Sequence, residues 1–133
     1  MREPEEPRWI TYEQAIAIHA RQLRRFGGAP GLRDEGMLRS ALERPINKWR
    51  YEQSDMAELA AAYAFGLAKN HAFVDGNKRT ALVVSFAFLD TNGIAVTASQ
   101  ENAYATILAL AAGEIDEQQL TDWFEANTGP LIR

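Results

Sequence analysis

Apolar residues recur at intervals of three and four along most of the chain, which is the spacing of one face of an α-helix. The first such stripe covers residues 11–26, opens on a Thr-Tyr-Glu-Gln capping box, and stops at the pair Gly27-Gly28. A second, shorter stripe predicts a helix over residues 34–43. Pro45 is expected to end this helix, because proline lacks the N–H that a helix interior needs.

The same spacing continues to the end of the chain. Residues 55–71 begin with an Asp-x-x-Glu capping box and carry one unbroken apolar stripe, whereas residues 80–92 are apolar on nearly every side. A short extended connector over residues 94–98 leads to two further helices, one around residues 103–111 and one from residue 116 onward. Because a helix without a polar face must be buried, the sequence predicts an all-α fold of about six helices around one central helix.

Composition narrows the class of protein. With 133 residues, 47% hydrophobic and 24% charged, the chain fits one globular domain, expected over residues 10–133 behind a flexible lead-in of residues 1–9. A net charge of -4 disfavours a direct nucleic-acid partner, and the absence of cysteine excludes a disulfide scaffold and a cysteine-bound metal. The longest apolar run, residues 81–89, is far shorter than the ~20 residues of a membrane span. We therefore expect a cytoplasmic protein without a membrane partner.

Residues 45–54 show neither a clear period nor strong turn signals. Two aromatic and two basic side chains alternate there, at Lys48, Trp49, Arg50 and Tyr51. Such a mixture is expected in an exposed flap that contacts another molecule. The simpler alternative is that the charges are solvated and that the aromatic rings only pack.

The stretch HAFVDGNKRT, residues 71–80, places unusual chemistry between two apolar helices. Gly76 and Asn77 are predicted to open the second helix, whose first N–H groups and positive dipole end favour an anion. Lys78 and Arg79 oppose that dipole, at roughly 0.3–1 kcal/mol each. Charge-assisted hydrogen bonds to a bound anion, roughly 1.5–3 kcal/mol apiece, would outweigh this cost. The two cations therefore indicate a phosphate site.

Two other residues of this stretch extend the prediction. Asp75 fits beside a phosphate if Mg²⁺ lies between them, and His71 can accept a proton near neutral pH. The residues alone thus predict a Mg²⁺-nucleotide site with a general base. Structural alternatives remain open, because Asp75 could cap the helix and Asn77 could simply form a turn. His19, on an apolar stripe, is expected to be a hydrogen-bonded structural residue.

The same residues carry a family resemblance. HAFVDGNKR resembles the signature loop of the Fic/Doc family, H-x-F-x-[D/E/N]-[G/A]-N-[G/K]-R, in the form with lysine that is typical of the death-on-curing (Doc) branch. FGGAPGLRDEGMLRSALERP, residues 26–45, is similar to the N-terminal segment of that branch, and the likeness extends over about residues 10–123. It implies an all-α Fic fold that uses ATP and Mg²⁺.

The resemblance also implies partners and roles. Doc proteins are toxins that phosphorylate a threonine of elongation factor Tu and arrest translation, and a separate antitoxin covers their site. By position, the resemblance implies the following roles: His71 as general base, Asp75 as Mg²⁺ ligand, Gly76 and Asn77 as anion-binding turn, Lys78 and Arg79 as phosphate ligands. The predicted flap at residues 48–51 would present the protein substrate.

Two departures from AMP-transferring relatives bear on the reaction. Those relatives usually have glycine where Lys78 stands and a second arginine where this chain has Leu82. Both differences favour transfer of a phosphoryl group over transfer of AMP. AMP transfer by the same site stays the alternative, and a non-catalytic module that binds phosphate or a peptide is the third hypothesis.

Overall fold

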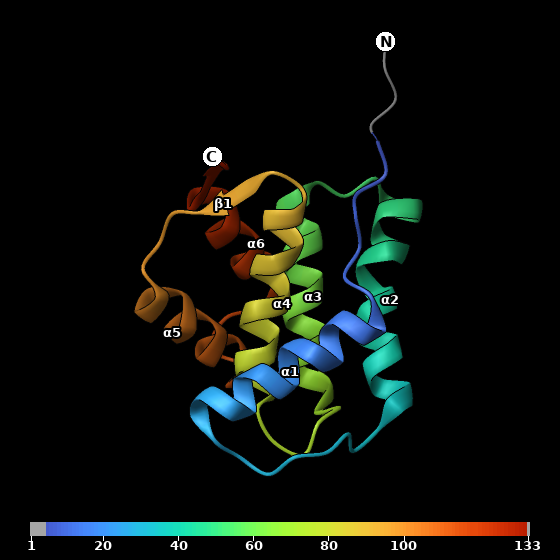
Figure 1. Cartoon of the computed structure of the whole chain (residues 1–133). Coiled ribbons are helices and arrows are strands. Elements are labelled where there is room, and N and C mark those ends of the chain that lie inside the picture. The colour runs from blue at the N-terminus through green and yellow to red at the C-terminus, as the bar shows by residue number, and fades with distance from the viewer. Residues whose placement is uncertain (1–4, 133) are drawn as a thin grey trace.

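The structure, a computed structural model, describes residues 5–132, and this part of the chain is almost entirely helical (Figure 1). The first four residues of the predicted lead-in lie outside the described residues. Residues 5–132 form the following elements: α1 (Tyr12–Phe26), α2 (Glu35–Glu52), α3 (Met56–Asn70), α4 (Asn77–Thr91), β1 (Ile94–Val96), α5 (Gln100–Ala111), α6 (Glu117–Ala126) and β2 (Thr128–Pro130). The predicted all-α class with six helices is confirmed.

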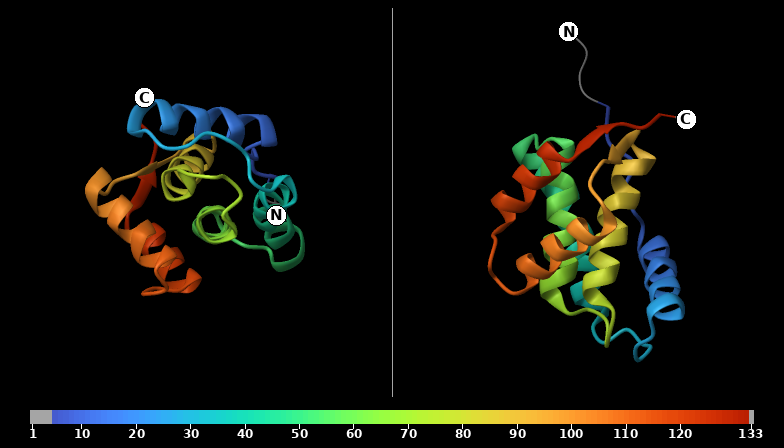
Figure 2. Two further views of the ribbon diagram at one scale, coloured as in Figure 1. Left: turned by 90° about the horizontal axis from the view of Figure 1, so that it is seen from below. Right: turned by 90° about the vertical axis from the view of Figure 1, so that its left-hand side faces the viewer.

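Helices α3 and α4 lie antiparallel at the centre of the molecule, with α1, α2 and the α5–α6 pair around them (Figure 2). Nine residues of α3 and seven of α4 are buried, so two helices share the central place predicted for residues 80–92 alone. Tyr63, Phe88 and Phe124 are among the largest fully buried side chains of this core. Within residues 5–132, no helix has both the length and the apolar surface that a membrane crossing would require.

The start of α4 differs from the starts of the other five described helices. In each of those five, an N-cap side chain accepts a hydrogen bond from a backbone N–H of the first turn: Thr11, Asp34, Asp55, Ser99 and Asp116. The N-cap of α4 is Gly76, which offers no side-chain cap. The first turn of α4 therefore has no N-cap side chain that accepts hydrogen bonds from its free N–H groups.

Helix α2 is longer than its sequence predicts, and the expectation that Pro45 ends it is wrong. Pro45 lies buried inside α2, which continues to Glu52. Tertiary contacts hold the second half of the helix: Arg44 pairs with Glu117 of α6, and Lys48 Nζ lies 3.6 Å from the same carboxylate. These contacts compensate for the hydrogen bond that proline cannot donate.

A two-stranded antiparallel sheet closes the end of the molecule opposite the α3–α4 connection (Figure 1). Ile94 of β1 faces Pro130 of β2, and Val96 faces Thr128. Residues 94–98 were predicted to be extended, but the pairing itself was not predicted. Strands of three residues are too short to show an alternating pattern.

The described part of the lead-in, residues 5–9, lies against the helices. Pro7 is buried, and the Trp9 ring stacks on Phe88 with 5.8 Å between ring centroids. The next residue, Ile10, donates its backbone N–H to the Tyr63 hydroxyl at 2.9 Å. This segment therefore covers part of the core.

Candidate active site

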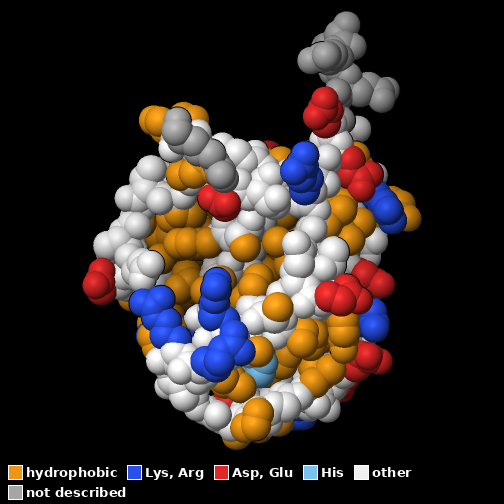
Figure 3. All heavy atoms as spheres, in the orientation of Figure 1, with side chains coloured by type: hydrophobic (Ala, Val, Ile, Leu, Met, Phe, Trp, Pro, Cys, Tyr) orange, Lys and Arg blue, Asp and Glu red, His pale blue; other side chains and the backbone are white. Residues whose placement is uncertain are grey.

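A pocket of about 310 Å³ lies where α3 ends and α4 begins, at the lower end of the molecule in Figure 1. Its lining includes all six motif residues singled out from the sequence, together with Val74 and Tyr104: His71, Asp75, Gly76, Asn77, Lys78 and Arg79. Figure 3 shows Lys and Arg side chains gathered in the lower left of that view although the chain is acidic overall, and Lys78 and Arg79 line the pocket. The pocket therefore combines a free helix start with local positive charge.

His71 is the C-cap of α3, and its backbone adopts a left-handed conformation with φ 50°. Such a conformation is uncommon for a residue other than glycine and occurs often at functional sites. Arg33 fixes it from outside the helix, because its Nε donates to the His71 carbonyl oxygen at 2.7 Å. The His71 side chain is exposed and makes no hydrogen bond to another residue within 5–132. Both ring nitrogens can therefore meet a substrate.

Gly76 brings the start of α4 to the pocket in a conformation that suits glycine. Its φ is 80°, and a Cβ atom there would lie 3.3 Å from Leu23 and 3.5 Å from the His19 ring. A larger residue would be strained and crowded at this position. The bare backbone of the first turn of α4 therefore faces the pocket, as anion binding at a helix start requires.

Asp75 presents one carboxylate oxygen for a ligand. Its Oδ2 accepts the backbone N–H of Ala29 at 3.0 Å, and Oδ1 has no partner within residues 5–132. The carboxylate does not cap α4, so the alternative N-cap interpretation is wrong. Residues 5–132 contain no group of three or more His, Cys, Asp or Glu side chains that could hold a metal ion. A single carboxylate fits Mg²⁺ only when phosphate oxygens and water complete the shell, which is the usual arrangement for Mg²⁺-nucleotides.

Asn77 and His19 hold the loop that connects α3 to α4. The Asn77 side chain both accepts from the Phe73 N–H at 3.0 Å and donates to the Phe73 carbonyl oxygen at 2.9 Å. His19 Nε2 lies 2.7 Å from the Asp75 carbonyl oxygen, and its ring stacks on Phe73 at 3.7 Å. His19 is buried, so its predicted structural role is confirmed. The side chain of Asn77 also serves the loop, as the turn interpretation predicts.

The segment between α1 and α2 runs alongside this loop. Leu32 forms an isolated antiparallel bridge with Phe73, and the Val74 N–H donates to the Gly31 carbonyl oxygen at 3.0 Å. The backbone N–H of Arg33 donates to the Ala72 carbonyl oxygen at 2.8 Å. The sequence predicted only a loop here. No local pattern in the residues 27–34 indicates the long-range pairing that fixes the site.

Lys78 and Arg79 are held differently. Lys78 is exposed. The guanidinium of Arg79 lies between two rings, with its Cζ 3.7 Å from the Tyr104 centroid and 4.0 Å from the Phe26 centroid. In the sequence, Phe26 and Tyr104 are members of apolar stripes, and nothing in their own segments points to the motif.

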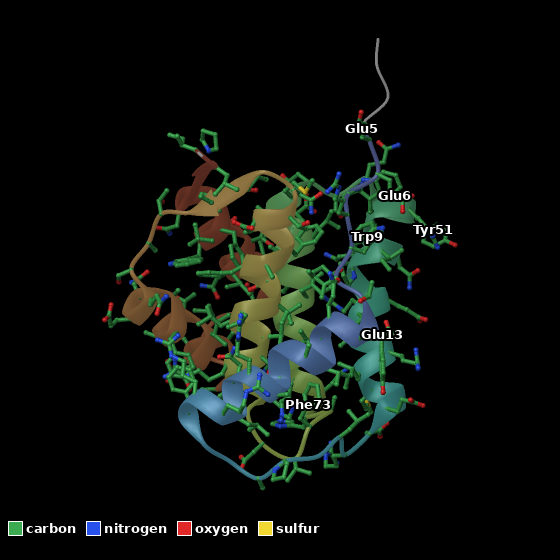
Figure 4. The ribbon with its side chains drawn as sticks, viewed as in Figure 1. Glu5, Glu6, Trp9, Glu13, Tyr51 and Phe73 are labelled. Carbon is green, nitrogen blue, oxygen red and sulfur yellow. The ribbon has the colours of Figure 1, made fainter. Side chains whose placement is uncertain are left out.

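The residues predicted to form a substrate flap are not brought to this pocket. Lys48, Trp49, Arg50 and Tyr51 lie in the last turns of α2, so they are helical rather than irregular. Figure 4 shows Tyr51 near the upper end of the molecule and Phe73 at the lower end. Lys48 is paired with Glu117, and Trp49 packs edge-on against Trp9 at 6.2 Å. Trp49 therefore packs and Arg50 is exposed, as the simpler alternative predicts, whereas Lys48 is ion-paired and Tyr51 is 82% exposed.

The chain is similar to known proteins over the helices that form the pocket. The model of the Fic/DOC family matches residues 9–89, which include α1 to α3, most of α4 and the whole motif. "Protein kinase doc" of Escherichia phage P1 is 39% identical over 116 residues, 86% of this chain and 91% of that protein. "Toxin Doc" of Mycolicibacterium smegmatis is 43% identical over 76 residues, 55% of this chain and 58% of that protein. The chain belongs to the Fic/DOC family.

Proposed function

We propose that this protein is the toxin of a toxin–antitoxin pair and transfers a phosphoryl group from Mg²⁺-ATP to a hydroxyl side chain of a protein. The observation that carries the proposal is the single pocket that gathers His71, a free carboxylate oxygen of Asp75 and the uncapped start of α4. Each of these parts has a distinct task in phosphoryl transfer, which depends on positioning and on charge stabilisation.

The pocket residues suit these tasks. The backbone at Gly76 and the cations Lys78 and Arg79 would bind phosphate oxygens. Asp75 would hold Mg²⁺, which neutralises phosphate charge when bound. His71 would accept the proton of the acceptor hydroxyl, since its imidazole is exposed and its backbone is fixed by Arg33.

Two features favour a phosphoryl group over AMP as the group transferred. Leu82 is 7% exposed and belongs to the core, so no second cation follows Arg79 on this helix turn. Lys78 adds a positive charge at the mouth of the pocket instead. The phage P1 relative is itself named a protein kinase.

The proposed partners follow from the same relatives. Both are Doc proteins, and one is named a toxin. We therefore include in the proposal a cognate antitoxin that covers the pocket and a substrate among the translation factors, elongation factor Tu first. Transfer to that factor would arrest translation.

The decisive test follows the label of ATP. The protein is incubated with Mg²⁺ and bacterial extract, in parallel with ATP labelled on the γ or on the α phosphate. We expect a protein band labelled from γ-labelled ATP only, with a mass increase of one phosphate. Label from α-labelled ATP would establish AMP transfer and refute the kinase assignment. No label from either, with growth arrest intact, would favour the non-catalytic hypothesis.

The role of His71 needs variants that tolerate its backbone. His71→Asn suits the left-handed conformation better than His71→Ala, because asparagine enters that region readily. Both should lower the transfer rate by roughly 10²–10⁴-fold. The melting temperature of His71→Asn should change little, since the imidazole makes no hydrogen bond to another residue within 5–132. Full activity in both variants would remove His71 from the mechanism.

A further inference from the structure

The guanidinium of Arg79 is enclosed by side chains from two other helices. Phe26 is the last residue of α1, Arg79 lies in the first turn of α4, and Tyr104 belongs to α5. The Arg79 Cζ lies 4.0 Å and 3.7 Å from the two ring centroids, within the range of strong cation–π contact. Three segments that are distant in sequence thus converge on one charged group.

These rings are the contacts that hold Arg79. Within residues 5–132, its side chain has no ion pair and no hydrogen-bond acceptor. Aromatic rings cover the faces of a guanidinium and leave its N–H groups, which lie in the plane, free to donate. Arg79 and Tyr104 both line the pocket, so those donors are available to a ligand there.

Phe26 is a large apolar side chain that lies exposed at the surface, although α1 does not require an apolar residue at its end. Its side chain is 49% exposed at the end of α1, where a polar residue would satisfy the helix equally well. A second arginine, Arg25, lies over the same ring at 5.3 Å. The ring therefore serves charged neighbours rather than the core.

We propose that Phe26 and Tyr104 are positioning residues that fix the plane of Arg79, so that its paired N–H groups bind a phosphate of the nucleotide. This inference rests on the proposed function. A guanidinium already held in one orientation loses little freedom when it binds, and planar recognition of phosphate by two parallel hydrogen bonds requires that orientation. The ring of Tyr104, not its hydroxyl, is the working part, since that hydroxyl has no hydrogen-bond partner within residues 5–132.

The test is a double-mutant cycle on the affinity for Mg²⁺-ATP, measured by titration calorimetry. Tyr104→Leu and Phe26→Leu should each weaken binding about 3- to 30-fold, the range that cation–π contacts span from exposed to desolvated sites. Tyr104→Phe keeps the ring and should restore most of the affinity. In an Arg79→Ala background, Tyr104→Leu should have almost no further effect. In a Lys78→Ala background it should keep its full effect, because no aromatic ring of the described residues lies against Lys78.

A matched control removes an equivalent ring elsewhere. Tyr12 stacks on Arg39 at 4.1 Å and does not line the pocket, so Tyr12→Leu should leave the affinity for ATP unchanged. Equal losses from Tyr104→Leu with and without Arg79 would overturn the proposal, since the ring would then act through general packing.

A second readout does not depend on nucleotide binding. The Arg79 Hε proton, assigned by comparison with Arg79→Lys, should show an upfield ring-current shift in the NMR spectrum. Each leucine variant should reduce that shift. If the leucine variants reduce the shift but the wild-type protein does not bind ATP, the clamp of Phe26 and Tyr104 on Arg79 is confirmed and the proposed function fails. An unshifted Hε signal in the wild-type protein would overturn the clamp itself.

Discussion

Replacing Asn77 by alanine separates two roles that the motif assigns to one side chain. The resemblance implies that Asn77 takes part in anion binding, whereas the structure shows its amide closing the loop on both polar atoms of the Phe73 backbone. Phe73 is 2% exposed, so water cannot easily take over these two bonds. We expect Asn77→Ala to act first on stability.

The magnitude follows from the two bonds. Each contributes about 0.5–1.5 kcal/mol net, so their loss should lower the free energy of unfolding by about 2 kcal/mol. For 133 residues the entropy of unfolding is roughly 0.28 kcal/mol/K, which converts this loss into a fall in melting temperature of about 7 °C. Asn70→Ala is the matched control, because it removes one exposed bond of 3.2 Å to the Met37 carbonyl oxygen. It should cost about 0.5 kcal/mol.

The assay pairs urea unfolding with ATP titration at a temperature where both variants are folded. A destabilised Asn77→Ala whose folded form keeps most of its affinity for Mg²⁺-ATP would establish the loop role. An unchanged melting temperature combined with at least tenfold weaker ATP binding would refute the reasoning, because the side chain would then act on the ligand and not on Phe73.

Three further predictions concern the scaffold. Burial raises the pKa of Tyr63 to about 12 from 10.0, so stability is complete below pH 10 and falls between pH 10 and 12, where only the unfolded chain loses the proton. The loss should reach about 2–3 kcal/mol in alkaline urea titrations, and Tyr63→Phe should abolish this slope. Gly66→Ala places a Cβ atom 3.1 Å from that of Ala41, and we expect about 1–3 kcal/mol of destabilisation by urea unfolding, from overpacking between α2 and α3. Glu117→Gln leaves the half-buried Arg44 without its charge partner and should lower the melting temperature measured by circular dichroism, by the equivalent of about 1–3 kcal/mol.

The sequence predicts those parts of the fold that local chemistry determines. Apolar spacing and capping boxes located five helices to within a few residues, and the predicted caps at Thr11 and Asp55 are present in the structure. The prediction for α2 was wrong because proline is a strong local signal that two ion pairs to a distant carboxylate override. The β1–β2 pairing escaped prediction for a similar reason: strands this short owe their existence to the partner.

The candidate site also contains residues that the sequence predicts and residues that it does not. His71, Asp75, Gly76 and Arg79 lie within nine positions, so the motif alone predicted six of the eight residues that line the pocket. The residues that orient them come from elsewhere in the chain. Arg33 fixes the His71 backbone across 38 positions, and other segments supply the partners of Asp75 and Arg79. Their own segments contain only ordinary loop and helix patterns, which is why sequence reasoning did not find them.

The geometry of the family motif depends on residues outside it. In the proposed function the signature residues supply the chemistry, and the groups that hold them in place are a backbone N–H at Ala29, the side chains of His19 and Arg33, and the rings around Arg79. A backbone donor and an aromatic ring can be supplied by many sequences. Substitutions in these supporting segments can therefore change the geometry of the pocket, and with it ligand affinity, while the motif itself stays intact. Differences in nucleotide placement between members of the family are thus expected to depend on the segments around the motif as well as on the motif.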